Sequence, residues 1–503
     1  MRWVVGVAAL VAAIVPACAA AETYDPVTLT AAEILKRAGD AVGKLQPGAY
    51  IEVDTTHGGG VDLTTTTITS GKDVETTTTG GGFTWSSGSF FGHRWEQDRN
   101  GVVRMVSDFR ANEDPNALAL RHPEDPQYRV KVLGETQTEP RQYVIEANPP
   151  GGVDCLYYYD AATFLLAQTV SYGRDRYKHV VTYGDYRNTY GLMNAFTERY
   201  SDGRPENDTT TQVVSFEKAA QPVDLSIPKT RPIYAQPSSG AVVLPADFTD
   251  HGIIVRATVN GRGIDLLLDS GASGLLLDPG IAHDLGLTPV GRSRRTIGGG
   301  DVDLGSVRVP EMSIGDLHLH DVVFETAPLD LPGDVHRVVG LLGYDFIASG
   351  LLKIDFKART AAILPRASFD PQALSAHAVP ADLDDGVPRV PASMEAVPGH
   401  FLVDTGAFKM LVFRNYAEKL PNKTGELAQT SILTVGGPMR TQIVNVSDFA
   451  FGGALFQTAE VTVPERSTFD IADYDGIIGR DALSVFQLYF DYEDGMIYTK
   501  VNR

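Results

Sequence analysis

Two aspartate residues stand in the same short pattern in the C-terminal half of the chain. An apolar run over 264–268 ends in an Asp-Ser-Gly tripeptide that begins at Asp269, and an apolar run over 401–403 ends in Asp-Thr-Gly from Asp404, 135 residues later. A short apolar run that stops at a glycine turn is typical of a buried strand. A lone buried carboxylate is unfavourable unless it is hydrogen-bonded. Two such carboxyl groups about 3 Å apart would share a proton, and the pair could act as general acid and general base.

The repeat extends beyond these two loops. Residues 341–345 (LLGYD) recur as 477–481 (IIGRD), and residues 352–356 (LKIDF) recur as 488–492 (LYFDY), both at a spacing of 136 residues. Register kept within one residue across three such segments predicts a duplicated structural unit. Two copies of one fold usually pair about a pseudo-twofold axis. The symmetry would bring the two aspartate loops together at that axis.

These motifs resemble those of the aspartic peptidases, and the retroviral (retropepsin) branch more than the pepsin branch. The resemblance covers roughly 254–501, about half of the chain. It implies that Asp269 and Asp404 are the catalytic pair, with an apolar-apolar-Gly segment bracing each loop. It also implies that two hydroxyl groups interlock beneath the pair. The supporting residues implied in this way are Ser270, Gly271, Thr405 and Gly406.

The two repeats differ at positions that matter for such a site. Tyr344 stands where the second repeat has Arg480, so an interaction made by that arginine is expected in one lobe only. Four residues after the aspartate the first repeat has Ser273, whereas the second has Phe408. The flap tyrosine of pepsin-like enzymes has no counterpart. We therefore expect asymmetric hydrogen bonding around the pair, and the choice of substrate is left open.

Each repeat has a glycine-rich segment after its aspartate loop. Flanked by strands, glycine clusters are often simple hairpin turns. By position, however, these segments resemble the retroviral flaps, which close over a bound peptide. The candidate flap residues are Ile297, Gly298 and Gly299 in the first repeat, and Val435, Gly436 and Gly437 in the second.

The expected activity is that of an aspartic endopeptidase acting on a peptide or protein. A carboxylate pair that activates water requires no metal, no cofactor and no covalent intermediate. His318 and His320 share one face of a predicted strand, but no third strong ligand accompanies them, so we expect no metal site. Two alternatives remain open. The aspartates could cap turns in an inactive relative, or the protein could be a non-catalytic periplasmic peptide- or lipid-binding protein with degenerate protease lobes.

The N-terminal residues 1–21 have the pattern of a secretory signal peptide, with Arg2 before an apolar core and small residues at the end. We therefore expect an exported protein, periplasmic or secreted. Acylation at Cys18 is the alternative. Without Cys18, Cys155 is the only cysteine, and no internal disulfide can form. The net charge of −20 argues against a nucleic-acid partner, because phosphates would be repelled.

The segment from Thr30 begins with a capping box and continues with apolar residues at helical spacing. Short strands separated by Gly and Asp turns then follow for almost two hundred residues. A helix followed by an antiparallel meander suggests a curved sheet wrapped on a helix. This arrangement, with the phrase at 95–101 (WEQDRNG), loosely resembles the LolA-like half-barrels that carry periplasmic lipoproteins. The resemblance implies a lipid or lipoprotein as a ligand of this domain.

The expected fold is mainly β, with two pseudo-symmetric retropepsin-like acid-protease β lobes preceded by a helix-plus-antiparallel-sheet domain. Because both lobes lie in one chain, we expect them to pair within it and the protein to be a monomer. The expected divisions are a signal peptide (1–21), an N-terminal β-rich domain (22–221), a Pro-rich linker (222–245), lobe 1 (246–366), an inter-lobe linker (367–386) and lobe 2 (387–503).

Overall fold

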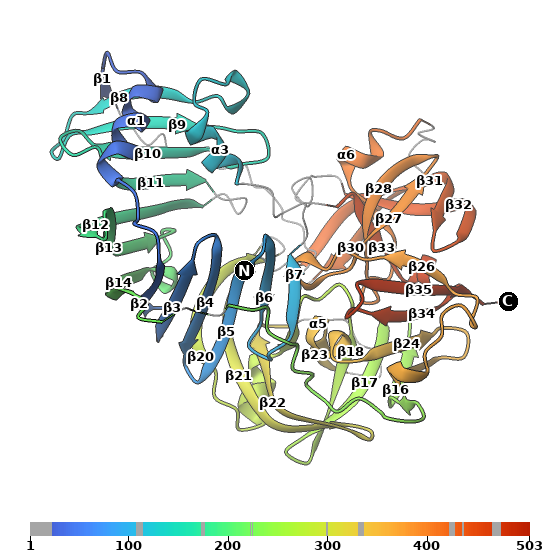
Figure 1. Cartoon of the computed structure of the whole chain (residues 1–503). Helices are drawn as coiled ribbons and strands as arrows, with labels where there is room; N and C mark the ends of the chain where they lie inside the picture. The colour runs from blue at the N-terminus through green and yellow to red at the C-terminus, as the bar shows by residue number, and fades with distance from the viewer. Residues whose placement is uncertain are drawn as a thin grey trace.

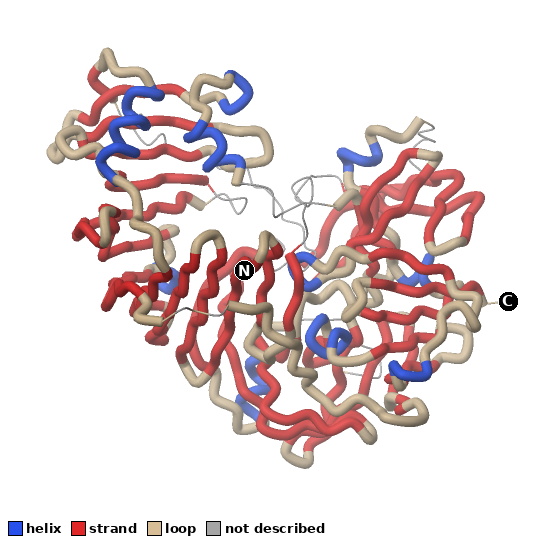
Figure 2. The backbone as a smooth tube through the Cα atoms, viewed as in Figure 1, coloured by secondary structure: helices blue, strands red, loops and turns tan. Residues whose placement is uncertain are grey.

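The structure is a computed structural model of the whole chain, and it is mainly β, as predicted. Strands from the N-terminal half lie on one side and the C-terminal half forms a second body beside them (Figures 1 and 2). In the described part of the chain, no helix is long and apolar enough to cross a membrane. The expected signal segment and Cys18 lie outside the described residues. Those are 23–106, 114–172, 177–221, 223, 225–297, 300–329, 337–421, 428–434, 437–464 and 474–502.

The N-terminal half forms one antiparallel sheet of 14 strands (Figure 1). Its order is β1-β8-β9-β10-β11-β12-β13-β14-β2-β3-β4-β5-β6-β7, so β14 closes back onto β2 and the edge strands are β1 and β7. The strands are β1 (Tyr24–Asp25), β2 (Ala49–Gly58), β3 (Val61–Ser70), β4 (Asp73–Gly80), β5 (Phe83–Phe90), β6 (His93–Gln97), β7 (Val103–Val106), β8 (Lys131–Thr136), β9 (Gln142–Ala147), β10 (Cys155–Asp160), β11 (Leu166–Tyr172), β12 (Lys178–Thr189), β13 (Leu192–Ser201) and β14 (Thr209–Lys218).

The predicted capping box opens helix α1 (Ala31–Val42). The hydroxyl of Thr30 accepts a hydrogen bond from the backbone N–H of Glu33, and the Glu33 carboxylate accepts from the backbone N–H of Thr30. Ile34 and Ala38 on one face of the helix pack into a cluster with residues of β9 and β10. A second helix, α3 (Pro115–Arg121), joins the same cluster through Ala119. The expected helix on a sheet is therefore confirmed.

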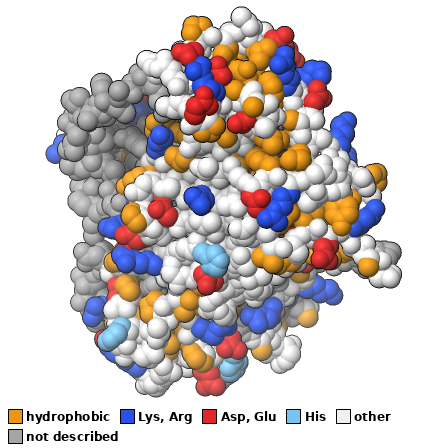
Figure 3. All heavy atoms as spheres, turned by 90° about the vertical axis from the view of Figure 1, so that its left-hand side faces the viewer, with side chains coloured by type: hydrophobic (Ala, Val, Ile, Leu, Met, Phe, Trp, Pro, Cys, Tyr) orange, Lys and Arg blue, Asp and Glu red, His pale blue; other side chains and the backbone are white. Residues whose placement is uncertain are grey.

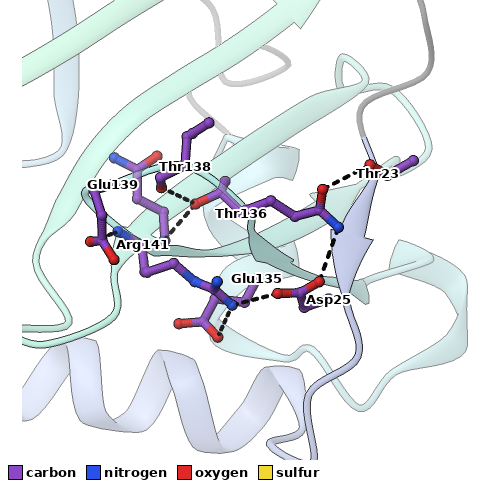
Figure 4. A network of polar contacts seen from close by, with 9 residues as sticks. Thr23, Asp25, Glu135, Thr136, Thr138, Glu139 and Arg141 are labelled. Atoms are coloured by element: carbon purple, nitrogen blue, oxygen red, sulfur yellow. Dashed lines mark hydrogen bonds and ion pairs between the residues drawn. The ribbon is translucent and has the colours of Figure 1, made fainter.

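A polar network ties the first strand to the sheet (Figure 4). Arg141 donates to the carboxylates of Asp25, on β1, and Glu135, on β8, at 2.7 and 3.0 Å. Hydrogen bonds from Gln137 and Arg141 hold the pKa of Asp25 below its usual value.

Seen from the side of this sheet, the surface carries several groups of hydrophobic side chains with charged residues between them (Figure 3).

The C-terminal half contains two sheets of matching topology. The first lobe has the order β16-β17-β18-β23-β19-β22-β21-β20, and the second has β27-β28-β33-β29-β32-β31-β30. In each, the strand before the aspartate pairs in parallel with the strand of the apolar-apolar-Gly segment. The two lobes predicted from the repeat are therefore confirmed as structural copies.

The strands and helices of the two lobes have the following bounds: β16 (Ala246–Thr249), β17 (Gly252–Val259), β18 (Arg262–Leu268), β19 (Leu275–Leu277), β20 (Val290–Ile297), β21 (Gly300–Ile314), β22 (Leu317–Thr326), β23 (Val338–Leu342), β27 (Arg389–Met394), β28 (Val397–Val403), β29 (Leu411–Val412), β30 (Ala428–Thr434), β31 (Gly437–Phe451), β32 (Ala454–Pro464), β33 (Gly476–Ile478), and helices α4 (Pro279–Asp284), α5 (Tyr344–Ala348), α6 (Arg414–Ala417) and α7 (Arg480–Leu483).

A third sheet of six strands joins the lobes. Its order is β15-β25-β24-β34-β35-β26, with β24 (Leu351–Asp355) from one lobe paired to β34 (Phe486–Asp491) from the other. Leu352 pairs with Phe490, and Ile354 pairs with Leu488. In the repeat, Leu352 corresponds to Leu488 and Ile354 corresponds to Phe490, so exchanging the two lobes gives the same pairs. Lys353 faces its own counterpart, Tyr489, which places the pseudo-twofold axis between them. The remaining strands are β15 (Val242–Val243), β25 (Thr360–Leu364), β26 (His377–Pro380) and β35 (Met496–Val501).

Neither segment expected to be a linker spans freely between domains. In the Pro-rich segment, Ile233 and Tyr234 are buried in the core of the lobes, and the Tyr234 hydroxyl donates to the Phe346 carbonyl at 2.9 Å. The same segment supplies β15, and the inter-lobe segment supplies β26 of the six-stranded sheet. The proline content indicated extended chain correctly. It did not show that this extended chain is packed against the lobes.

The N-terminal sheet is docked on the first lobe, along the edge strand β20. The side-chain amide of Asn207 donates to the Arg294 carbonyl at 2.7 Å and accepts from the Arg294 N–H at 2.8 Å. The Arg292 N–H donates to the carbonyl of Gly59, in the turn between β2 and β3, at 2.5 Å. The guanidinium of Arg308 donates to the Gly82 carbonyl at 2.6 Å. The segment 222–245, expected to be a linker, therefore does not keep this sheet apart from the first lobe, because these hydrogen bonds join the two.

Candidate active site

Each aspartate lies at the end of a buried strand, held there by its parallel neighbour. Asp269 follows β18, and its N–H donates to the carbonyl of Leu342, on β23, at 3.0 Å. Asp404 follows β28, and its N–H donates to the carbonyl of Ile478, on β33, at 3.1 Å. The apolar strands must be buried on both faces, and this forces the polar residues that follow them into the centre of the molecule. The two loops meet there.

The hydroxyl groups of Ser270 and Thr405 interlock the loops. The Ser270 hydroxyl donates to the Val403 carbonyl and the Thr405 hydroxyl donates to the Leu268 carbonyl, both at 2.8 Å. Each hydroxyl also accepts the backbone N–H of the other residue, at 3.0 Å. Both residues are buried, with exposures of 1% and 0%. These four reciprocal bonds fix one loop against the other without a flexible side chain between them.

Each carboxyl group is seated against the glycine of the opposite loop. A Cβ atom added at Gly271 would stand 2.5 Å from Cγ of Asp404, and one added at Gly406 would stand 2.6 Å from Cγ of Asp269. Such contacts exclude any side chain at either position. The glycines are therefore required because the carboxyl of the other lobe approaches the backbone this closely. The arrangement places the two carboxyl groups side by side across the axis.

The two carboxyl groups behave as one titrating pair. Burial raises the pKa of Asp269 well above its usual value, and the neighbouring charge of Asp404 and a hydrogen bond between the two carboxyls raise it further. Burial also raises the pKa of Asp404. The Asp404 carboxylate accepts backbone N–H groups from Gly406 and Ala407, and backbone hydrogen bonds from Gly271 and Ala272 lower the pKa of Asp269 in the same way. The hydrogen bond between the carboxyls raises the pKa of Asp269 and lowers that of Asp404, and the Arg480 charge lowers the pKa of Asp404 as well, so Asp269 is the better holder of the shared proton.

The short segments after β23 and β33 brace the aspartate loops from behind. The N–H of Tyr344 donates to the Ala272 carbonyl, and the N–H of Arg480 donates to the Ala407 carbonyl, both at 2.9 Å. A Cβ at Gly343 would lie 2.4 Å from the Ala272 carbonyl oxygen, so only glycine allows this approach. The structure therefore places both apolar-apolar-Gly segments where the repeat predicted them.

Arg480 has a role that the first lobe does not copy. Its guanidinium donates to the carbonyls of Thr249 and Asp250, in the first lobe, at 3.0 and 2.7 Å. It also lies over the ring of Phe408, 5.5 Å from the ring centroid. Tyr344, its counterpart, is instead buried and stacks on Tyr492 with ring centroids 5.5 Å apart. The asymmetry expected from the sequence is present.

The positions four residues after the aspartates also differ. Ser273 is buried, and its hydroxyl has no hydrogen-bond partner in the structure. Phe408 is 54% exposed. One side of the site therefore has a buried hydroxyl and the other an exposed aromatic ring.

The candidate flaps are β-hairpins. Ile297 pairs with Gly300 at the end of the β20–β21 hairpin, and Thr434 pairs with Gly437 at the end of the β30–β31 hairpin. Gly298, Gly299, Val435 and Gly436 lie outside the described residues. The hairpin form is confirmed, and the closing role stays a prediction.

Sequence reasoning missed some polar residues near the pair. Tyr492 is fully buried, its hydroxyl has no partner, and its pKa is raised by burial first and then by Tyr344, Asp269 and Asp404. In the sequence, Tyr492 follows the pattern of an ordinary core aromatic residue, so nothing marked it as a residue of the site. The repeated aspartates Asp355 and Asp491, at the ends of β24 and β34, are both buried, and Asp491 pairs with Arg366 at 2.7 Å, which is a role in bracing the fold.

The described residues contain no group of three or more His, Cys, Asp or Glu side chains arranged to hold a metal ion. His318 and His320 both point to the exposed face of β22. Cys155 is a buried free thiol whose pKa is raised by burial. A raised thiol pKa disfavours the thiolate, and this residue is therefore a poor nucleophile.

Comparison with known families agrees with this geometry. The aspartyl protease family model matches residues 255–346 and residues 390–482, one match in each lobe. Each matched segment contains one of the two aspartate loops and its bracing segment. The resemblance to aspartic peptidases inferred from the motifs is thus confirmed for the two lobes. No curated protein matches the chain.

Three solved structures are similar to the N-terminal part of the chain. A LolA superfamily protein from Nitrosomonas europaea has 13% identity and a TM-score of 0.29, covering 39% of this chain and 96% of that one. A putative outer membrane lipoprotein-sorting protein domain from Vibrio parahaemolyticus has 14% identity and a TM-score of 0.29, covering 38% and 94%. A DUF1329 family protein from Desulfovibrio piger has 16% identity and a TM-score of 0.30, covering 39% and 94%.

Proposed function

We propose that the protein is an aspartic endopeptidase that hydrolyses peptide bonds with a water molecule activated by Asp269 and Asp404. The observation that supports this most is the seating of the two carboxyl groups. Each lies against the glycine of the other lobe, above hydroxyl groups that lock the loops together. An aspartate that only capped a turn would need neither the second carboxyl nor the interlock.

The mechanism follows from the shared proton. Asp404, whose pKa is lowered by the hydrogen bond with Asp269 and by the Arg480 charge, acts as the general base and takes a proton from a water held between the carboxyl groups. Asp269 keeps the shared proton and donates a hydrogen bond to the carbonyl oxygen of the scissile peptide. Water attack gives a tetrahedral intermediate. The proton taken up by Asp404 then passes to the leaving nitrogen, and the C–N bond breaks.

The asymmetry around the pair gives the substrate a direction. The exposed ring of Phe408 offers an apolar surface to a substrate side chain on the second-lobe side. On the first-lobe side the corresponding residue, Ser273, is buried and presents no such surface. The peptide is thus bound in one orientation, in contrast to a symmetric pair of lobes.

The proposal also includes a location for the enzyme and a role for its N-terminal sheet. The signal-like residues 1–21 support an exported enzyme. The curved 14-stranded sheet with its helix supports the recruitment of substrates that carry a hydrophobic or lipid chain. A lipidated peptide should then have a lower KM than the same peptide without its lipid. Equal KM values for the two peptides would exclude recruitment by the N-terminal sheet. The competing role for this domain is inhibition of the protease lobes.

A statine-type transition-state analogue tests the proposal. It should block cleavage of a fluorescently labelled casein and bind the wild-type protein at least about a hundredfold more tightly than Asp269→Asn, because only the intact pair recognises the tetrahedral centre. Equal binding to both proteins would favour the alternative, in which the lobes only clamp a ligand.

A further inference from the structure

The two lobes satisfy one equivalent pair of carboxyl groups in different ways, Asp345 being buried and Asp481 half-buried. Asp345 and Asp481 occupy the same position in the repeat, two residues after the bracing glycine. Asp481 is satisfied within its own lobe: its carboxylate accepts the N–H of Met410 at 3.2 Å and that of Ala482 at 2.9 Å. Asp345 instead accepts a hydrogen bond from the side chain of Asn100 at 2.9 Å. Asn100 belongs to the turn between β6 and β7 of the N-terminal sheet.

Asn100 is buried against the first lobe, although it belongs to the N-terminal sheet. It is 3% exposed. Its amide nitrogen also donates to the carbonyl of Val323, on β22, at 2.9 Å, and its amide oxygen accepts the N–H of the same residue at 2.7 Å. The turn is held in shape by Asp98, whose carboxylate accepts the N–H groups of Asn100 and Val102. The side chain therefore completes the edge of a lobe strand and satisfies a buried carboxyl group at once.

A second carboxyl group and a cation come from the same part of the sheet. Burial raises the pKa of Asp345, and the neighbouring carboxyl group of Asp98 raises it further. Arg104, on β7, is paired with Glu96, on β6. A Cβ at Gly386, beside the first-lobe loop, would stand 3.3 Å from Nη1 of Arg104 and 2.8 Å from the Ser273 carbonyl oxygen. The N-terminal sheet thus reaches the aspartate loop from two directions.

A short series of contacts connects Asn100 to Asp269. Asp345 is the neighbour of Tyr344, whose N–H donates to the Ala272 carbonyl. The Ala272 N–H in turn donates to the Asp269 carbonyl at 3.3 Å. Without Asn100, a buried carboxyl group would lose its amide donor, and a buried polar group without a partner is unfavourable. The segment that carries Asp345 would have to shift, and the aspartate loop with it.

We infer that Asn100 is a positioning residue for Asp269, and that the N-terminal sheet is therefore a working part of the first catalytic lobe rather than an appended module. The inference rests on the proposed peptidase function. It explains why the second lobe needs no such partner, because Asp481 finds its donors in its own backbone.

The test compares full-length Asn100→Ala with Asn194→Ala, which removes a single side-chain hydrogen bond to Glu52 inside the N-terminal sheet. With labelled casein as substrate, Asn100→Ala should lower kcat by about tenfold to a hundredfold, since small displacements of a catalytic group have effects of that size, while KM changes less. Asn194→Ala should stay near wild type. A kcat for Asn100→Ala within about twofold of wild type would overturn the inference.

A double-mutant cycle separates positioning from general damage. Asp345→Ala should also lower kcat, and the Asn100→Ala, Asp345→Ala double variant should be no worse than the poorer single variant, because the two residues act through one contact. Asp345→Asn keeps the shape and should recover most of the kcat lost in Asp345→Ala. Additive losses, or no recovery, would contradict the positioning role.

Amide hydrogen exchange supplies a readout that does not depend on activity. In Asn100→Ala, exchange should quicken in 269–273 and 341–347 as well as in the altered turn. Faster exchange confined to the N-terminal sheet would overturn the inference. If the wild-type protein cleaves no casein while exchange changes as expected, the peptidase proposal fails and the structural coupling stands.

Discussion

At the scale of single residues, the two catalytic candidates are chemically alike but placed in unequal surroundings. Asp404 accepts two backbone N–H groups and lies near the Arg480 cation, which lowers its pKa against the effect of burial. The pKa of Asp269 is raised by burial first, and then by the charge of Asp404 and by the hydrogen bond between the two carboxyl groups. This inequality gives the pair one proton and two distinct roles.

The pH dependence of kcat follows from that proton. Both pKa values lie above the usual value for aspartate, so the pair keeps its proton into mildly acidic solution and loses it as pH rises further. At low pH, the base becomes protonated as well. We expect a bell-shaped profile with activity between about pH 4 and about 6.5, because pairing pushes the two carboxyl pKa values apart. A rate that kept rising above neutral pH would point to another nucleophile.

The glycines of the two loops allow an equally local test. Gly406→Ala would place a Cβ 2.6 Å from Cγ of Asp269, so the carboxyl group must move. We expect kcat to fall at least about a hundredfold. Gly184→Ala is a matched control, since a Cβ there meets no atom within 4 Å. Near-normal kcat for Gly406→Ala in a folded protein would show that the carboxyl position is not critical.

At the scale of elements, the two candidate flap hairpins are anchored differently. The edge strand β20 of the first hairpin is bonded to the N-terminal sheet through Asn207 and Gly59. The second hairpin ends its sheet with β30, for which the described residues show pairing with β31 alone. The first hairpin should therefore move less when substrate enters.

Asn207→Ala tests this difference. Loss of the two hydrogen bonds to Arg294 should raise the amide exchange rate in β20 by roughly tenfold, the equivalent of about one net hydrogen bond. Exchange in β30 should not change. Hydrogen exchange read by mass spectrometry, with Asn194→Ala as the control, decides the point. Equal protection of β20 in both variants would mean that other contacts hold it.

At the scale of the whole molecule, several buried carboxyl groups have the same effect on stability. The pKa values of Asp269, Asp345 and Asp404 are all raised in the folded protein. Folding therefore favours their protonated forms. The stability they contribute is fully present below the unfolded pKa of about 3.9 and is lost as pH rises through the folded values.

We expect the urea midpoint of the full chain to be higher near pH 5 than near pH 8. Asp345→Asn should flatten this dependence, because an amide has no proton to lose. Three further ionisable side chains, Asp98, Tyr344 and Arg104, interact with it, and the Arg104 charge opposes the rise in the pKa of Asp345. A midpoint in Asp345→Asn that depended on pH as steeply as in wild type would exclude Asp345 as a contributor.

The sequence predicted the repeated parts of this molecule because repetition is visible in spacing. The loops at Asp269 and Asp404, both bracing segments and the pairing of the lobes all follow from offsets of 135 and 136 residues. Asn100 follows from no such pattern. Its partners, Val323 and Asp345, lie 223 and 245 residues further along the chain. A buried interface between different domains leaves no period, and the proline-rich segment between them suggested separation.

The central claim is that Asp269 and Asp404 perform hydrolysis together. The most direct measurement is the cleavage of labelled casein at about pH 5 by Asp269→Asn, Asp404→Asn and the control Asp316→Asn, all checked for folding by circular dichroism. Asparagine keeps the shape of each side chain and removes its acid–base role, so we expect both catalytic variants to lose at least about a thousandfold in kcat and the control to match wild type. Substantial cleavage by either catalytic variant would contradict the assignment of the pair.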